Sequence, residues 1–459
     1  MKRIVTLLLA AGLVFGAFSG AQAADVKVKG QWDFAFEWTD NTKFKGSKHG
    51  GAGEDDFDAR QRLRTQIDIV ASEALSGTVY FEIGNSSWGA SDAALGADGL
   101  AVEVKRSYID WIVPQTDLKV RMGIQGIALP GFVAGSPILD DDVAGLTASY
   151  AFNSNVAVTA GWARPYNQSA TAESATTNTF DEMDLGFLAV PVTLDGVKVT
   201  PWAMYGQIGK DTQISGASSK YAVAGLLPLN KSGLDSTDSS TDMWWAGLSA
   251  EMTMFSPFRV ALDGVYGSVD ANAEAWDRAG WLIIGAVDYK MDMFTPGIFA
   301  WYGSGDDSDA ANGSEMMPYI APDFGPTSFG FNKVSPGIAT EGILSGSGAG
   351  TWGIGLQAKD IMFLEGLKHT FRVAYVKGTN AKNLATAPTD FRKDNFGVYL
   401  TEEDSAWEVN FDHAYKIYEN LDLLVEMGYI KLDMDKDVWA AKGDFDDAWK
   451  FGINLKYGF

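Results

Sequence analysis

Three arginines occupy alternating positions in one short stretch of the sequence. Arg60, Arg62 and Arg64 are each separated by a single residue, and the apolar residues Leu63 and Ile67 have the opposite parity. Successive side chains of a β-strand point to opposite faces, so in a strand all three guanidinium groups project from one face. Like charges this close repel each other and stay solvated unless anions or carboxylates approach them. The stretch therefore predicts a cationic wall that meets anionic groups, and the alternative is a solvated wall with no special role.

An apolar segment of the sequence is followed directly by three acidic residues. Residues 127–139 are too apolar to lie in water, and they end in Asp140, Asp141 and Asp142. Such a loop finds cover by folding back inside its own fold. We therefore expect an inward-folded loop near 126–142 that carries the aspartates toward the arginines; the alternative is a loop that caps a neighbouring subunit. The residues predicted to form a charged constriction are Arg60, Arg62, Arg64, Arg106, Lys119, Arg121, Asp140, Asp141 and Asp142.

One loop offers the kind of ligands that calcium prefers. Asp307, Asp309 and Asn312 lie close together in a stretch that contains glycine, and their oxygens are hard ligands. The full spacing of a calcium loop is missing, so a solvated acidic loop is the alternative. We expect no cofactor to be required, with a calcium ion in this loop as an additional hypothesis.

Motifs that would indicate an enzyme fail their context. Residues 348–353 match G-x-G-x-x-G, but they follow a loop and open a strand, which is the wrong setting for dinucleotide binding. The three histidines, His49, His369 and His413, are far apart in the sequence, and there is no cysteine. A nucleophile and a base on neighbouring strands are therefore not indicated. The sequence does not predict an enzyme.

The elements that position these residues are strands. Val26, Val28 and Trp32 begin an alternation of apolar and polar residues, and the pattern repeats to the end of the chain, through Tyr457 and Phe459. We predict 18 strands, with 16 as the alternative. Besides the two terminal strands, the predicted strands are centred near Leu63, Phe81, Tyr108, Val120, Ala148, Val158, Phe187, Val199, Leu248, Leu262, Ile284, Ile298, Ile354, Phe371, Val409 and Val425.

The connections between these strands alternate in length, with short turns on one side and long polar loops on the other. Aromatic residues recur eight positions apart on one strand face, as in Phe258 with Tyr266 and Trp407 with Tyr415. Long loops on one side only, with two aromatic belts around an apolar band, are typical of a transmembrane antiparallel β-barrel. The fold class is therefore all-β, with short periplasmic turns and long extracellular loops.

Composition limits the partners and the compartment. The chain has 459 residues, a formal net charge of -23 and 51 glycines. A strongly acidic chain lacks the positive surplus that nucleic acid requires. Residues 1–23 combine a basic start, an apolar stretch and a small-residue cleavage site, which indicates a signal peptide. We expect residues 24–459 to form a single barrel domain in the bacterial outer membrane, in contact with its lipid.

Several blocks also resemble a known family. KGQWDFAFEW, ARQRLRTQIDIVASEALSGTVYFEIG, KRSYIDW, LKVRMGIQGIALPG, SPILDDDVAGLTASY and the ending FGINLKYGF resemble the outer-membrane homotrimeric porins of sulfate-reducing bacteria. The resemblance implies a homotrimer of diffusion channels. General porins, which are more distantly similar, usually have sixteen strands and an inward third loop opposite a basic cluster. The terminal Tyr457-Gly458-Phe459 resembles the signal that the barrel-assembly machinery reads.

We therefore expect a water-filled channel for passive diffusion of small hydrophilic solutes and ions. The alternative is a solute-specific channel for a small organic acid, anion or sugar. Such a channel would use a file of inward aromatic side chains, for which the candidates are Tyr80, Tyr108, Trp202, Trp245 and Trp301.

Overall fold

The structure is a computed structural model. It describes residues 24–44, 56–89, 102–167, 182–209, 212, 225–228, 231, 240–309, 311–331, 337–383, 398–439 and 445–459. The expected signal peptide at 1–23 and His49 lie outside the described residues.

Strands make up nearly all of the regular structure, and they lie where alternation predicts them. In chain order they are β1 (Asp25–Asp40), β2 (Asp56–Ser72), β3 (Leu75–Ser87), β4 (Glu103–Ile112), β5 (Lys119–Ala128), β6 (Asp140–Ala151), β7 (Ala157–Asn167), β8 (Glu182–Ala189), β9 (Val192–Leu194), β10 (Val197–Gly209), β11 (Ser240–Met252), β12 (Phe258–Asp270), β13 (Arg278–Tyr289), β14 (Thr295–Gly303), β15 (Thr351–Leu364), β16 (Leu367–Gly378), β17 (Ser405–Tyr418), β18 (Leu421–Asp433) and β19 (Ala448–Gly458).

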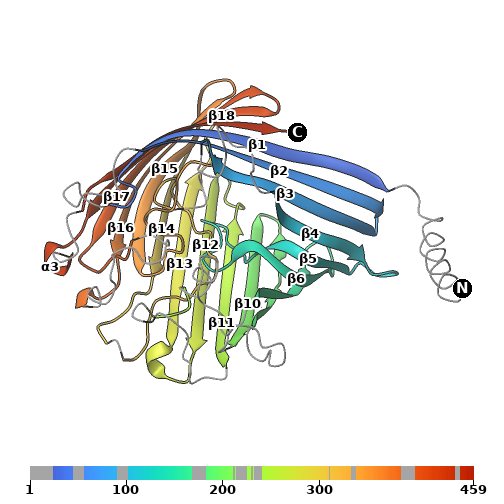
Figure 1. Cartoon of the computed structure of the whole chain (residues 1–459), viewed down its shortest axis with the longest axis horizontal. Coiled ribbons are helices and arrows are strands. Elements are labelled where there is room, and N and C mark those ends of the chain that lie inside the picture. The colour runs from blue at the N-terminus through green and yellow to red at the C-terminus, as the bar shows by residue number, and fades with distance from the viewer. Residues whose placement is uncertain are drawn as a thin grey trace, which may run out of the picture.

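The strands close into an antiparallel barrel of 18 (Figure 1). β8 and β9 both pair with β10 and act as one strand, which Pro191 interrupts because proline has no N–H for the ladder. β1 pairs with β2 on one side and with β19 on the other, so the sheet has no free lateral edge around most of its height. The prediction of 18 strands is confirmed, including those near Phe187 and Ile298, and the alternative of 16 is wrong.

The outer face carries the apolar side chains. Aromatic rings from neighbouring strands touch there, as Trp281 does with Tyr302 at 5.1 Å and Phe258 with Tyr289 at 4.8 Å between ring centroids. All four are exposed although they are aromatic. Two belts of exposed aromatic residues separated along each strand are what a lipid-facing barrel wall requires.

Helical structure is short wherever it occurs in the described residues, and two such elements have complete bounds. One is a 3₁₀ turn at Glu274–Trp276, and the other is α3 at Lys436–Trp439. Among the described residues, no helix is long and apolar enough to cross a membrane.

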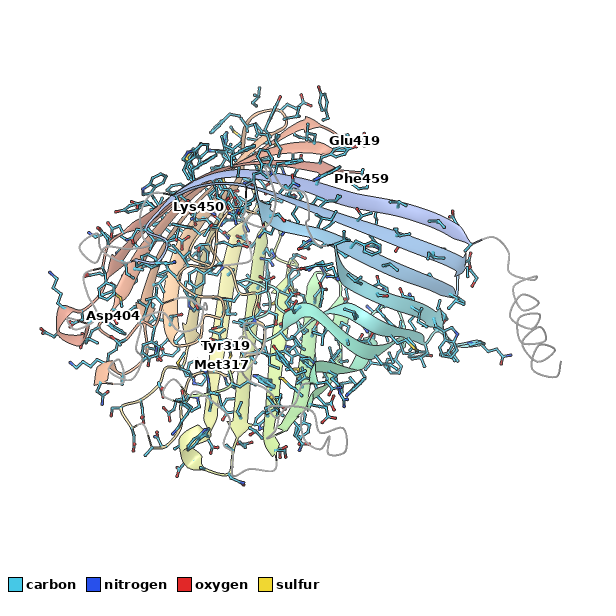
Figure 2. All side chains as sticks on the ribbon, in the orientation of Figure 1. Met317, Tyr319, Asp404, Glu419, Lys450 and Phe459 are labelled. Atoms are coloured by element: carbon cyan, nitrogen blue, oxygen red, sulfur yellow. The ribbon has the colours of Figure 1, made fainter. Side chains whose placement is uncertain are left out.

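The barrel interior contains packed protein as well as charged wall. Residues 304–350, which we call the long inner loop, contribute fully buried rings and aliphatic side chains such as Phe324, Phe329, Phe331 and Leu344. Figure 2 shows Met317 and Tyr319 of this loop within the outline of the barrel. The alternation of short and long connections predicts that this loop is external, like the other long ones. That expectation is wrong, because its apolar side chains are covered only when the loop lies against the inner wall.

Candidate functional site

A second connection also crosses the interior. Residues 129–139, between β5 and β6, form what we call the short inner loop. Its tip is bound to β12, where the Asp263 carboxylate accepts hydrogen bonds from the backbone N–H of Phe132 at 2.9 Å and of Val133 at 2.8 Å. Arg259 donates to the carbonyl oxygen of Phe132 at 2.7 Å. The tip is therefore held by charged groups of a distant part of the wall.

The two inner loops support each other through backbone hydrogen bonds. The N–H of Asp323 donates to the carbonyl of Ser136 at 2.8 Å, and the N–H of Gly325 donates to the carbonyl of Ala134 at 2.8 Å. Leu139 also bridges to Ala321 in parallel. The short inner loop thus lies inside the barrel and is supported by backbone hydrogen bonds from the long inner loop. Together they narrow the lumen.

The arginine file of β2 faces the lumen, and each member has an acidic partner on an adjacent strand. Arg60 meets Glu37 at 2.8 Å, Arg62 meets Asp33 at 3.4 Å and Arg64 meets Glu82 at 2.5 Å. Asp33 and Glu37 come from β1, and Glu82 comes from β3. The file is therefore a wall of paired charges rather than a bare cationic surface. No ion pair joins it directly to the aspartate triplet among the described residues.

A chain of ion pairs nevertheless connects the two sets. Lys105 contacts Glu82 at 4.0 Å and Asp142 at 2.8 Å, and Asp142 also meets Arg106 at 2.5 Å. Since Glu82 also pairs with Arg64, an unbroken series of ion pairs connects the arginine file to the aspartate triplet. Asp142 is thus the triplet member that contacts a predicted basic residue.

The other triplet members have different roles. Asp141 accepts a hydrogen bond from the backbone N–H of Asp142 at 2.7 Å. Asp140 lies at the start of β6, where its own N–H donates to the carbonyl of Ala321 at 2.9 Å. The backbone of Asp140 therefore joins β6 to the long inner loop.

Lys105 and Glu82 were not identified from the sequence. Glu82 shares the inner face with Tyr80, so alternation could have found it. Lys105 sits where the β3–β4 register shifts, between the pairs Tyr80 with Arg106 and Phe81 with Val104. A register shift breaks the simple alternation of faces. No signal in the sequence marks that irregularity.

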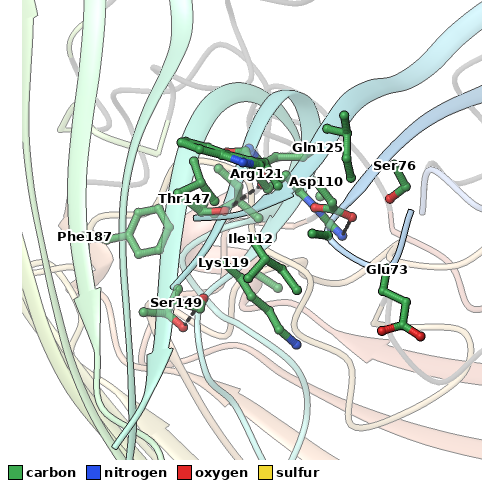
Figure 3. Close-up of a pocket in the computed structure, with 18 residues that line it drawn as sticks. Glu73, Ser76, Asp110, Ile112, Lys119, Arg121, Gln125, Thr147, Ser149 and Phe187 are labelled. Atoms are coloured by element: carbon green, nitrogen blue, oxygen red, sulfur yellow. Dashed lines mark hydrogen bonds and ion pairs between the residues drawn. The ribbon is translucent and has the colours of Figure 1, made fainter. Parts of the chain in front are cut away.

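Arg121 and Lys119 line a cavity of about 520 Å³ in the wall (Figure 3). Arg121 makes two hydrogen bonds to Asp110, at 2.7 and 2.8 Å, and lies 4.0 Å from the ring centre of Tyr108. Among the described residues, the Lys119 amine has no ion-pair partner. Ser149, Thr147 and Phe187 also line the cavity, together with the acidic residues Glu73 and Asp110. The lining therefore combines an unpaired amine with polar, acidic and apolar surface.

The inward aromatics do not form a continuous track. Trp245 is fully buried and donates to the carbonyl of Pro318 at 2.8 Å, and Trp301 packs on Phe324 and Phe331 of the long inner loop. Trp202 is buried as well. Trp245 and Trp301 therefore hold the long inner loop rather than guide a solute.

The proposed calcium ligands are engaged within their own turn. The Asp307 carboxylate accepts from the N–H of Asp309 at 2.6 Å and from the side-chain amide of Asn312 at 3.2 Å. Asp309 in turn accepts from the N–H of Ala311 at 2.9 Å. In the described part of the chain, no group of three or more carboxylate or imidazole side chains is placed to hold a metal. Calcium binding by this loop stays a prediction.

A buried arginine joins two loops through its guanidinium group. Arg278, at the start of β13, donates to the carbonyl oxygens of Leu227 at 2.9 Å and of Met316 and Met317 at 3.0 Å. Asp306 lies in the same region, and burial raises its pKa to about 6, although Arg278 acts in the opposite direction. Its carboxyl group is therefore mainly protonated below about pH 6 and mainly ionised above it.

We expect the packing of this loop to weaken as pH rises. The folded pKa of Asp306 is about 6 against an ordinary 3.8, so its contribution is fully present below pH 3.8 and is lost as pH rises through 6. The shift corresponds to at most about 3 kcal/mol. Hydrogen exchange of residues 311–331 at pH 4.5 and 7.5 measures it, and Asp306→Asn should remove the difference. An equal difference in the variant would assign the pH effect to groups other than Asp306.

Comparisons with known proteins identify the fold and leave the family open. No family model matches the chain, and no curated protein matches it. Among solved structures, it is similar to a BenF-like porin from Pseudomonas fluorescens Pf-5 (10% identity, TM-score 0.56, covering 95% of this chain and 98% of that one). It is also similar to the outer membrane protein OprD from Pseudomonas aeruginosa (12% identity, TM-score 0.55, covering 96% and 95%). Pseudomonas aeruginosa OpdQ is a third (11% identity, TM-score 0.53, covering 95% and 98%). At these identities the similarity shows a shared barrel fold.

Proposed function

We propose that the protein is an outer-membrane porin, a water-filled channel for passive diffusion of small hydrophilic solutes and ions. The observation that carries this proposal is the short inner loop, which crosses a closed barrel and narrows it beside a wall of paired charges. A closed barrel with an apolar outer face and a charged interior suits a solute path through a lipid layer. The barrel fold shared with one protein described as a porin and another described as an outer membrane protein supports it.

A second candidate is a solute-specific channel for a small organic acid or other anion. The cavity around Lys119 favours it, because an unpaired amine beside the hydroxyl of Ser149 and the ring of Phe187 suits a small anion with an apolar body. Single-channel recording separates the two candidates. An ohmic pore that organic anions do not block supports general diffusion, whereas saturable block that Lys119→Ala relieves supports the specific channel.

Ion selectivity tests the predicted constriction. A charge about 8 Å from a permeating ion is worth roughly 0.5 to 2 kcal/mol at an effective dielectric between about 80 and 20. Replacing Arg60, Arg62 and Arg64 together by alanine should shift the reversal potential toward cations, because their acidic partners remain. Replacing the three aspartates from Asp140 to Asp142 by asparagine should shift it toward anions. The measurement belongs at low salt, where screening is least. Unchanged potentials in both variants would remove these residues from the ion path.

We also propose that the chain assembles as a homotrimer and enters the membrane through the barrel-assembly machinery. The resemblance to porins of sulfate-reducing bacteria supports the trimer, and cross-linking of the folded protein followed by mass measurement tests it. The exposed terminal Phe459 supports the second point.

Deleting Phe459 should sharply lower the amount of folded, heat-modifiable protein in outer membranes. Its backbone exchanges two hydrogen bonds with Gly30, at 2.8 and 3.0 Å, and these close the seam between β19 and β1. Phe459→Ala keeps those bonds and separates the effect of the ring from that of the seam. Phe255→Ala, at an exposed aromatic residue in a short turn, is the matched control. Normal folding of both Phe459 variants would count against a terminal assembly signal.

A further inference from the structure

Two histidines face each other across neighbouring strands on the outer wall of the barrel. His369 of β16 and His413 of β17 are direct register partners. Both share a parity with the exposed Phe411, while Asp412, of opposite parity, is buried on the inner face. The pair therefore lies outside the lumen.

The two imidazole rings each direct a nitrogen atom toward the other ring. The Nδ1 atoms of His369 and His413 are 2.6 Å apart, and the rings stand nearly perpendicular at 85° with centroids 4.8 Å apart. At that separation one nitrogen carries a proton and the other a lone pair, because two lone pairs or two N–H groups would repel each other. A metal ion takes the place of such a shared proton and binds both lone pairs.

The surroundings hold the rings in place. Phe411 lies against both imidazoles, with ring centroids at 6.0 Å from His369 and 4.3 Å from His413. Phe363 packs on the other side of His369 at 6.2 Å. The antiparallel ladder fixes the backbones of both residues. A site whose two ligands are already oriented loses little conformational freedom when an ion binds.

We propose that His369 and His413 form a binding site for one divalent transition-metal ion that bridges β16 and β17 at the turn end of the barrel. Tetrahedral bonds of about 2.0–2.1 Å to nitrogen place two ligand atoms about 3.4 Å apart, so small side-chain rotations open the pair enough. Imidazole nitrogens suit Cu²⁺, Ni²⁺ and Zn²⁺, with Cu²⁺ bound most tightly, and they do not suit Ca²⁺ or Mg²⁺. The turn end of the barrel borders water, which supplies the remaining ligands. The site is independent of the proposed transport function, since it faces away from the lumen.

The test uses the full chain without a polyhistidine tag, folded in detergent. Titration with Zn²⁺ followed by calorimetry should give one ion per chain. Electron paramagnetic resonance of the Cu²⁺ form should show two nitrogen ligands. His369→Gln and His413→Gln should each weaken binding by about tenfold or more. His49→Gln, at the third histidine of the chain, is the matched control and should bind like the parent.

Each outcome is decisive. Equal affinity in the parent and in the double variant, or no saturable binding below millimolar metal, would overturn the proposal. If a variant fails to fold, the parent protein still decides, because Zn²⁺ should protect His369 and His413 together from diethylpyrocarbonate. Equal modification with and without Zn²⁺ would overturn it. Conductance should be the same with and without the ion.

Discussion

Replacing Glu408 by alanine is expected to release the long inner loop from the barrel wall and to raise single-channel conductance. The fully buried carboxylate accepts hydrogen bonds from the Thr327 hydroxyl at 2.7 Å, from the N–H groups of Phe329 at 3.1 Å and Gly330 at 2.9 Å, and from the Asn410 amide at 2.8 Å. Alanine would leave these donors buried without that acceptor. A buried unsatisfied donor costs about 1–3 kcal/mol, so the docked state should lose roughly 3 kcal/mol or more.

That loss lowers the ratio of docked to open loop by about a hundredfold or more, since 1.4 kcal/mol corresponds to a factor of ten. Bilayer recordings should show larger or flickering steps, and limited proteolysis should cut the loop faster. The barrel itself should persist because its strands pair independently of the loop. Glu419→Ala, at an exposed acid in the β17–β18 turn (Figure 2), is the control and should change neither measurement. Parental conductance and proteolysis in the Glu408 variant would show that other contacts suffice to hold the loop.

Glu408 is not the only residue that holds the long inner loop against the wall, so the loop can move only partly in any single variant. Lys450 is fully buried and donates to the carbonyl oxygens of Ser328 at 2.5 Å and Thr340 at 3.0 Å. The Asp412 carboxylate accepts from the Ser328 hydroxyl at 2.8 Å. The charges that hold the loop thus come from β17 and β19, which are joined through β18. Loss of one anchor should loosen the loop locally, near residues 327–330.

The sequence predicted the wall of the barrel better than its contents. The alternation of apolar and polar residues predicted every strand of the barrel, because one strand face meets lipid and the other meets water or protein. That constraint acts on each residue separately. Partners across strands depend on register instead. Asp33 meets Arg62 because they are opposite each other in the β1–β2 ladder, and a single sequence does not state that alignment. The acidic partners of the arginine file were therefore missed although the file itself was found.

The two inner loops differ in how well the sequence predicts that they lie inside the barrel. An inward-folded loop was expected near 126–142 because residues 127–139 are nearly all apolar. The loop itself spans 129–139, since β5 continues to Ala128 and β6 begins at Asp140. The long inner loop places Met317, Ile320 and Phe324 among glycines and polar residues, so the average polarity of the loop concealed its buried apolar side chains. The run of residues 316–320 was the available signal. Counting apolar residues over short windows within a long loop would have found it.

Replacing Asp263 by alanine should free the tip of the short inner loop and widen the narrow part of the lumen. This carboxylate is 5% exposed and accepts hydrogen bonds from the backbone N–H of Phe132, which is shared between both oxygens, and from that of Val133. Hydrogen bonds to a charged acceptor contribute about 1.5–3 kcal/mol each, and the tip would lose about 3 kcal/mol in total because they share one group. Conductance should rise and selectivity should shift, since Arg259 loses a neighbouring negative charge.

The comparison of Asp263→Ala with Asp263→Asn separates charge from contact. Asparagine keeps one acceptor oxygen but presents N–H groups to at least one backbone donor, so it should resemble alanine in conductance. Asp292→Ala, at an exposed acid in the β13–β14 turn, is the matched control and should leave the channel unchanged. The long inner loop still supports the base of the short inner loop through the Ser136 and Ala134 carbonyls, so the freed segment is the tip alone. An unchanged conductance in both Asp263 variants would mean that the hydrogen bonds from the long inner loop, and not the carboxylate on β12, set the width of the pore.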